Sequence, residues 1–204
     1  MDSVLLSIHP RFVHKIIDGE KTVEIRKSKP NIDVPFKCYI YMTSGGYQYQ
    51  RSCWSTAVMP PNGEMYNGSQ SIVGEFICNN IDRLTLQHFT VFGHENIYAP
   101  VENKENIDFQ WLKHSCLDYS EVVTYGKLAP LYVWSISNLV IYNQPKMLQN
   151  FRKKFFCNGK CIDCLQLVFH DDMPADCALG GFEAEKWYLL NRPPQSWCYV
   201  QECK

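Results

Sequence analysis

The chain has 204 residues, of which 46% are hydrophobic and 20% are charged, a composition typical of a globular domain with a core of some size. Its 20 basic and 21 acidic side chains nearly cancel, which excludes an electrostatic clamp for long nucleic acid, so any such role would depend on a local patch or pocket. The amino terminus has no basic leader and no segment reaches the roughly 20 apolar residues of a membrane helix, so we expect a cytoplasmic protein with no membrane contact.

A strand and a short helix are predicted at the start of the chain. Residues 4–8 form an apolar run typical of a strand. Pro10 then begins a helix, because its fixed φ angle and its missing N–H cost nothing in the first turn. Gly19 ends this helix, since a left-handed residue is least strained without a side chain.

The next predicted strand carries charged side chains on one face. Residues 21–26 alternate between apolar and polar positions, and the polar positions are Thr22, Glu24 and Arg26. A row of this kind is either a solvated sheet face or the floor of a polar pocket.

Further short strands follow along the chain. Residues 36–42 and 71–78 are predicted strands, separated by a long loop over residues 44–70 that is rich in glycine and proline. Residues 118–125 are predicted to form a short helix that stops at Gly126. The remaining expected elements are two strands, a small helical turn and a final strand, at residues 131–136, 139–142, 145–151 and 197–200. This pattern predicts an α+β, mainly β fold in which small helices close a curved sheet or barrel.

One passage resembles a known family. Residues 7–27, SIHPRFVHKIIDGEKTVEIRK, resemble the opening of an ASCH domain, a PUA-like family named for activating signal cointegrator homology. The strands at 35–43, 71–78 and 132–142 follow in the order that such domains use, and the tail RPPQSWCYV is similar to that of phage and bacterial relatives. The family signature Gly-x-Lys-Thr-x-Glu-x-Arg is present as Gly19, Lys21, Thr22, Glu24 and Arg26.

The resemblance implies a small PUA-like β-barrel with a cleft between sheet and helices, in a superfamily that binds RNA or recognises modified bases. One relative, a bacterial acetylcytidine amidohydrolase, uses a lysine, a threonine and a glutamate in catalysis. By position this implies catalytic roles for Lys21 and for Glu75 in the strand 71–78. The threonine is not matched, because Glu24 stands three residues beyond the lysine.

The residues themselves support a polar cleft. Glu24 and Arg26 share a strand face about 7 Å apart, where a carboxylate and a guanidinium can meet a base edge, although an ordinary ion pair would use the same residues. We expect Lys21 and Glu75 to line the same cleft and to exchange a proton if the protein is an enzyme. Aromatic side chains would stack on a base. The predicted ligand-binding aromatics are Tyr41 and Trp134, and further candidates are Tyr47, Tyr49 and Trp54. The alternative is that these side chains pack in the core.

Two further features concern the edges of the cleft and the charge of a later segment. Ser7 and His9 precede the helix and could lie at the cleft mouth, although a histidine before a proline is more often a loop residue. Residues 145–160 hold five basic side chains and no acidic one, which indicates either a phosphate contact or a solvated segment.

The chain has ten cysteines, and four of them suggest a structural zinc site. In a reducing compartment cysteines are expected as free thiols or metal ligands. Cys157, Cys161 and Cys164 have the spacing C-x3-C-x2-C, which also occurs in the iron–sulfur motif of radical enzymes that use S-adenosylmethionine. Those enzymes need a large barrel after the motif, and too little chain follows here, so we reject this interpretation. Zinc would instead hold a segment with no core of its own, with His170 as a competing ligand. The predicted ligands are Cys157, Cys161, Cys164 and Cys177.

Three regions and three functions follow as predictions. We expect an ASCH domain at 1–150, a cysteine-rich insertion at 151–186 and a tail at 187–204 that packs back on the barrel. The first function is a module that binds RNA or a modified nucleoside or nucleotide. The second is a small hydrolase of modified nucleosides, or a ribonuclease, that uses Lys21 and Glu75. The third is an adaptor that acts through the long loop and the cysteine segment.

Overall fold

A computed structural model describes residues 3–45, 55–91, 94–100, 109–156 and 185–203. Within these ranges, every helix is too short or too polar to cross a bilayer. The predicted zinc ligands lie outside the described residues, and so do most of the residues assigned to the cysteine-rich insertion.

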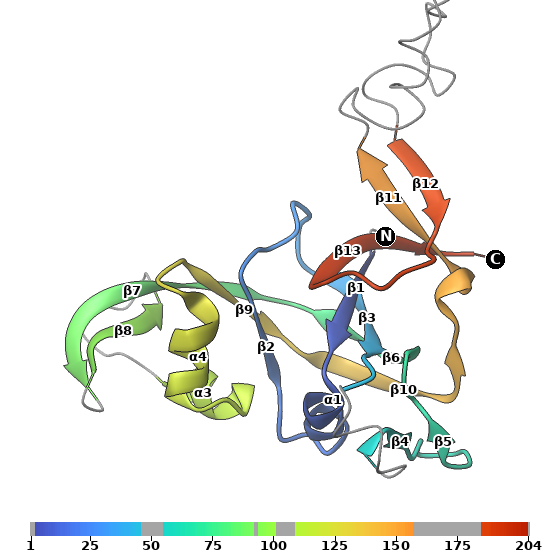
Figure 1. Cartoon of the computed structure of the whole chain (residues 1–204), viewed down its shortest axis with the longest axis horizontal. Helices are drawn as coiled ribbons and strands as arrows, with labels where there is room; N and C mark the ends of the chain where they lie inside the picture. The colour runs from blue at the N-terminus through green and yellow to red at the C-terminus, as the bar shows by residue number, and fades with distance from the viewer. Residues whose placement is uncertain (1–2, 46–54, 92–93, 101–108, 157–184, 204) are drawn as a thin grey trace, which may run out of the picture.

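The larger sheet contains seven strands in the order β10-β6-β3-β1-β13-β11-β12 (Figure 1). The central strands β1 and β3 pair in parallel, and every other neighbouring pair in this sheet is antiparallel. In chain order the strands are β1 (Ser3–Ile8), β3 (Phe36–Met42), β6 (Ser71–Cys78), β10 (Ser137–Lys146), β11 (Phe151–Phe156), β12 (Glu185–Leu189) and β13 (Trp197–Glu202).

A smaller antiparallel sheet of four strands has the order β2-β9-β7-β8. Its strands are β2 (Val23–Arg26), β7 (Ile81–Val91), β8 (His94–Pro100) and β9 (Leu131–Ser135). The chain runs from β9 almost directly into β10, so one extended segment passes from the smaller sheet to the larger one (Figure 1). Two very short strands, β4 (Ala57–Val58) and β5 (Tyr66–Asn67), form a separate pair.

The helices are short, and the first has both predicted end signals. Helix α1 (Pro10–Ile17) has proline in its first turn and is capped by His9, whose side chain accepts a hydrogen bond from the Arg11 N–H. Gly19 follows with a φ angle of +73°. The other helices within the described ranges are α3 (Gln110–Ser115), α4 (Tyr119–Gly126) and the single turn η2 (Leu148–Asn150).

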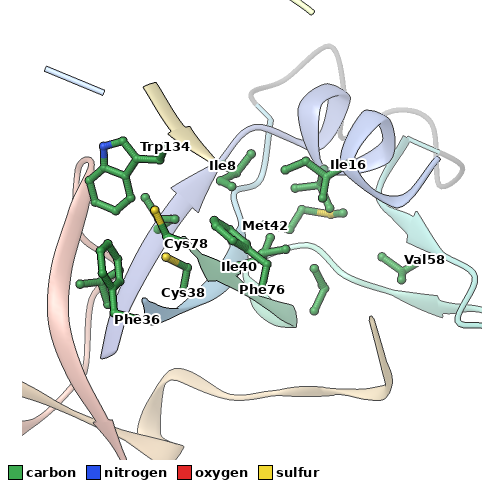
Figure 2. Close-up of a cluster of buried hydrophobic side chains, with 14 residues drawn as sticks. Ile8, Ile16, Phe36, Cys38, Ile40, Met42, Val58, Phe76, Cys78 and Trp134 are labelled. Carbon is green, nitrogen blue, oxygen red and sulfur yellow. The ribbon is translucent and has the colours of Figure 1, made fainter. Parts of the chain in front are cut away.

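The main core lies between the inner face of the larger sheet, helix α1 and Trp134 of the smaller sheet (Figure 2). Alternate residues of β3 supply much of it, as the sequence pattern predicts: Phe36, Cys38, Ile40 and Met42. Trp134 is fully buried and meets the Phe36 ring edge-on at 5.7 Å between centroids. This core joins the two sheets.

Two further clusters cover the remaining apolar faces. The opposite face of the larger sheet holds a second cluster that includes Leu5, Tyr39, Tyr41 and Phe151. A third cluster lies in the smaller sheet under α3 and α4, and Ile25 of β2 belongs to it. Strand β2 therefore packs its apolar side chains against α3 and α4 and turns Glu24 and Arg26 the other way.

The predicted α+β, mainly β fold class is confirmed, and some elements had not been expected. Strands β7 and β8 and helix α3 fall within residues 79–117, for which the pattern predicts no element. The expected loop at 44–70 contains the short strands β4 and β5, and the expected helical turn at 145–151 is reduced to η2. Pro145 lies in β10, where an edge strand tolerates the missing N–H.

Gly74 is required where β6 passes the backbone of β10, because a Cβ at this position would lie 2.5 Å from the Val140 carbonyl oxygen. We expect Gly74→Ala to destabilise the protein by about 2–3 kcal/mol, since the obstacle is backbone. Gly19→Ala meets nothing within 4 Å, and its positive φ angle alone should cost about 1 kcal/mol. Urea unfolding of both variants measures the difference, and equal losses would contradict the close approach of the two strands.

Candidate functional site

A cavity of about 300 Å³ opens between α1, β2 and α4. Its volume is at the lower end of the range for small-molecule sites. The apolar part of its lining comes mainly from Ile8, Phe12, Ile25 and Leu117. The polar part comes from Ser7, His9, Lys21, Glu24, Arg26, Glu121 and Tyr125.

The floor of this cavity is the polar row of β2 together with Lys21. Lys21, Glu24 and Arg26 are only 2%, 8% and 6% exposed. Lys21 Nζ lies 3.2 Å from Glu24 Oε2, and Arg26 Nε lies 3.1 Å from Glu24 Oε1. The carboxylate therefore stands between two buried cations, one on each of its oxygens. We call these three residues the ionic row.

Both cations of the ionic row are also bound to backbone or hydroxyl groups of other segments. Lys21 Nζ donates to the Ser115 carbonyl oxygen at the end of α3, at 2.7 Å. Arg26 Nη2 donates to the Ser7 carbonyl oxygen of β1 at 2.8 Å, and Nη1 donates to Ser196 Oγ at 3.4 Å. The ionic row thus links the smaller sheet to α3, to β1 and to the segment before β13.

Hydrogen-bonding capacity in the ionic row is left over. Among the described residues, neither Glu24 Oε2 nor Arg26 Nε has a partner with hydrogen-bond geometry, although each lies in an ion pair. A carboxylate offers about four lone-pair directions, a guanidinium five N–H groups and an ammonium three. The two unpartnered atoms are themselves shielded from solvent, and the polar groups of the floor are those of the lining side chains Lys21, Glu24 and Arg26.

Two aromatic side chains come to the cavity from different helices. Phe12 lies on α1, and its ring centroid is 5.0 Å from Lys21 Nζ. Tyr125 lies on α4, and its ring is 4.8 Å from Nζ of the exposed Lys27. Burial raises the pKa of Tyr125, which keeps its hydroxyl protonated at neutral pH.

The cavity rim holds a contact between α1 and α4. Arg11 Nη2 of α1 donates to Glu121 Oε1 of α4, and Glu121 also forms a capping box with Asp118. His9 Nε2 lies 3.3 Å from the Gly45 carbonyl oxygen. Burial lowers the pKa of His9 despite this backbone contact, so a neutral imidazole is favoured at pH 7.

The structure brings together some of the sequence-predicted residues. Lys21, Glu24 and Arg26 line one cavity, and Ser7 and His9 lie beside them in its lining. Thr22 is outside the lining, and its backbone bonds to His114 and Ile136 instead.

The aromatic candidates within the described residues lie elsewhere. Tyr41 belongs to the second core cluster and Trp134 to the main core, at 3% and 0% exposure. Neither lines the cavity, so the structure assigns both to packing rather than to a base platform. Tyr47, Tyr49 and Trp54 lie outside the described residues.

Glu75 does not join the ionic row, which corrects the expected shared cleft. It is absent from the cavity lining and lies on β6, where Lys37 Nζ donates to Oε1 at 2.6 Å and the Tyr142 hydroxyl donates to Oε2 at 2.5 Å. The next residue, Phe76, is in the main core, so alternation along β6 turns Glu75 to the opposite face of the sheet. The expected proton exchange with Lys21 therefore lacks its geometry.

Glu75 instead belongs to a second ionic cluster with Lys37, Tyr142, Lys146 and Glu202. Lys146 Nζ donates to Glu202 at 2.5 Å and lies 4.3 Å from the centre of the Tyr142 ring. Burial raises the pKa of Glu75, but the hydrogen bonds from Lys37 and Tyr142 and the nearby positive charges together lower it below its usual 4.5. Every member of this cluster has a partner, which is the arrangement of a structural network.

Sequence reasoning missed Phe12 and Tyr125 as lining residues. Phe12 appears in the sequence as part of the apolar stripe of α1, and Tyr125 as the last residue before a helix-ending glycine. The signal that could have found them is position: each lies on a short helix adjacent to the polar strand in the fold. Lys146 of the basic segment is paired with Glu202, whereas Arg152 and Lys153 are exposed on β11.

The described residues contain no group of three or more His, Cys, Asp or Glu side chains placed to hold a metal ion. The predicted zinc ligands Cys157, Cys161, Cys164 and Cys177 stay predictions, because they lie outside the described residues. Buried Cys38, Cys78 and Cys198 are free thiols, consistent with core packing.

The comparisons with known proteins found similarity in structure only. The crystal structure of an ASCH protein from Zymomonas mobilis aligns with a TM-score of 0.46 and 13% identity, over 99% of this chain and 87% of that chain. A variant of the same protein gives the same TM-score and identity over 100% of this chain and 91% of that chain. No protein-family model and no curated protein sequence matches the chain. Membership of the ASCH family therefore stays a prediction from the sequence signature.

The second ionic cluster makes stability depend on pH. Because the pKa of Glu75 is lower in the folded state, its carboxylate stabilises the fold above about pH 4.5, and this contribution is lost as the pH falls through the folded-state pKa. We expect Glu75→Gln to cost about 1–3 kcal/mol at pH 7 and progressively less below pH 4.5. Urea unfolding at a series of pH values measures this gap, with Glu64→Gln, at an exposed carboxylate, as the control. A gap that stays constant down to pH 3 would contradict the argument.

Proposed function

We propose that this chain is an ASCH-type module that binds a base of RNA, or a modified nucleoside or nucleotide, in the cavity between α1, β2 and α4. The proposal places the base on the ionic row and against the aromatic lining. It concerns binding, and it needs no metal ion in the cavity.

The observation that carries this proposal is the burial of three charged groups at the floor of an open cavity. Removing charges from water costs free energy, and a buried ion pair repays that cost only when its remaining donors and acceptors are satisfied. In the described part of the chain, Glu24 Oε2 and Arg26 Nε lack aligned hydrogen bonds although the residues are buried. Charged side chains that line a cavity and are otherwise buried are typical of ligand sites, and all three residues of the ionic row line this cavity.

The size and lining of the cavity fit one base with its sugar. A volume of about 300 Å³ is small for a dinucleotide cofactor but sufficient for a nucleoside. Phe12 and Tyr125 bring aromatic rings to the lining, and we expect the base to stack on Tyr125, which is worth about 1–3 kcal/mol per base. Lys27 is exposed next to Tyr125, where it can contact a phosphate.

The hydrolase hypothesis has less support from the geometry. Its second carboxylate, Glu75, pairs with Lys37 and Tyr142 outside the cavity. The carboxylate next to Lys21 is Glu24, at the position where the related amidohydrolase has threonine. We therefore expect binding of acetylcytidine, if it occurs, without loss of the acetyl group.

The binding test is a fluorescence titration of labelled single-stranded RNA, with nucleosides as competitors, at two salt concentrations. We expect RNA to bind, nucleosides to compete, and Tyr125→Leu to weaken binding about 5-fold to 100-fold through lost stacking. Lys27→Gln should reduce the dependence of affinity on salt.

The matched control is Tyr66→Leu, the same substitution at a half-buried tyrosine outside the cavity, which should leave RNA affinity unchanged. Circular dichroism would verify that both variants are folded. If neither RNA nor any nucleoside binds the wild-type chain, the proposed function is wrong. Turnover of acetylcytidine by the wild type, lost in Lys21→Met, would instead favour the hydrolase.

A further inference from the structure

The ionic row has a fixed order of hydrogen-bonding character. Lys21 carries only donors, Glu24 as a carboxylate carries only acceptors, and Arg26 carries only donors. Glu24 stands in the middle, because Lys21 contacts one of its oxygens and Arg26 the other. The cavity floor therefore presents the sequence donor, acceptor, donor.

We propose that this order selects a base with an imide edge, a carbonyl, an N–H and a second carbonyl in a row, which among the four RNA bases is uracil. This inference rests on the proposed function, because it assumes that the cavity binds a base. The two carbonyl oxygens accept from Lys21 and Arg26, and the N3–H donates to the Glu24 carboxylate. All three contacts are charge-assisted hydrogen bonds.

The other bases match this order less well. Guanine presents a carbonyl, an N–H and an amino group, so its amino group meets a cation that has no acceptor. Cytosine presents an amino group, a ring nitrogen acceptor and a carbonyl, and its ring nitrogen meets the carboxylate. Adenine presents only an amino group and a ring acceptor, so even with its amino group on Glu24 and its ring nitrogen at a cation it makes two of the three contacts. Uridine alone matches all three groups, so it is expected to bind more tightly than guanosine, cytidine and adenosine.

The mismatches are costly here because the ionic row is buried. Glu24 is 8% exposed, and Lys21 and Arg26 are less exposed still, so water has little access to a group that a ligand leaves unmatched. Leaving a buried donor or acceptor without a partner costs about 1–3 kcal/mol of binding free energy. Sites built to hydrogen-bond one group therefore reject analogues that lack it.

The cations keep this order because other contacts hold them in place. Ser115 carbonyl fixes Lys21 Nζ, and the Ser7 carbonyl fixes Arg26 Nη2. After these bonds, Lys21 and Arg26 still have N–H groups available to a ligand. The floor is thus arranged before the base enters, which reduces the entropy cost of binding.

The experiment is isothermal titration calorimetry of the full chain with uridine, 3-methyluridine, cytidine, guanosine and adenosine, and with an oligouridine strand. 3-Methyluridine keeps both carbonyls and carries a methyl group in place of the N3–H. We expect uridine to bind at least about tenfold more tightly than 3-methyluridine and cytidine. Tighter binding of oligouridine than of uridine would identify RNA as the source of the base, and equal binding would identify the free nucleoside.

The diagnostic variant is Glu24→Gln, which replaces the central acceptor by an amide with a donor of its own. It should weaken uridine binding about tenfold and narrow the difference between uridine and cytidine. Glu75→Gln is the matched control, because Glu75 also pairs with a lysine but lies outside the cavity. It should preserve both affinities at pH 7.

The outcomes separate this inference from the function on which it rests. If nucleosides bind but cytidine or adenosine equals uridine, the imide inference is wrong and the base-binding module stands. Equal weakening of all nucleosides by Glu24→Gln would also overturn the inference, because a merely structural role leaves the ratio unchanged. If no nucleoside and no RNA binds, both the inference and the proposed function are wrong.

Discussion

The contact of the Glu24 carboxylate with Lys21 and Arg26 is the interaction on which the arrangement of the site depends. Strand β2 is only four residues long and, among the described strands, pairs with β9 alone, so backbone pairing connects it to one neighbour. Lys21 and Arg26 connect β2 to other elements, because Lys21 binds the end of α3 and Arg26 binds β1. The smaller sheet, α3 and the larger sheet thus meet at one carboxylate, and the cavity lies on it.

Two ionic clusters on the molecule illustrate different uses of buried charge. Around Glu75, lysine and tyrosine donors satisfy both carboxylate oxygens, and the cluster ties β6, β3 and β10 together. Around Glu24, the ion pairs leave two buried atoms without an aligned hydrogen bond, and all three charged residues line a cavity. A satisfied network stabilises a sheet, whereas an incompletely satisfied one costs free energy until a ligand completes it. This difference is why the proposed function is assigned to the ionic row.

Much of the local structure could be predicted from the sequence, and the partners of Glu75 could not. The start of α1 at Pro10, its end near Gly19 and the alternation of β3 follow from short-range rules that need no tertiary contact. Alternation separates the two faces of β6, but both faces carry apolar residues, so the pattern does not indicate which face meets the cleft. Tyr41 and Trp134 lie in core clusters and outside the cavity lining, because an aromatic side chain on either face of a sheet can be covered by a separate cluster.

The sequence by itself determined that Glu24 and Arg26 share one face of β2, because alternation along a strand fixes which side chains point the same way. Lys21 precedes β2 and joins them through its contact with the Glu24 carboxylate. Only the tertiary structure decided what lies opposite them. Phe12 of α1 and Tyr125 of α4 both line the cavity, although they are more than one hundred residues apart in the chain. Glu75 lies on the opposite face of the larger sheet, where it pairs with Lys37. The physical reason is that the packing of helices and sheets over three separate cores sets these long-range contacts, and no short-range pattern encodes that packing.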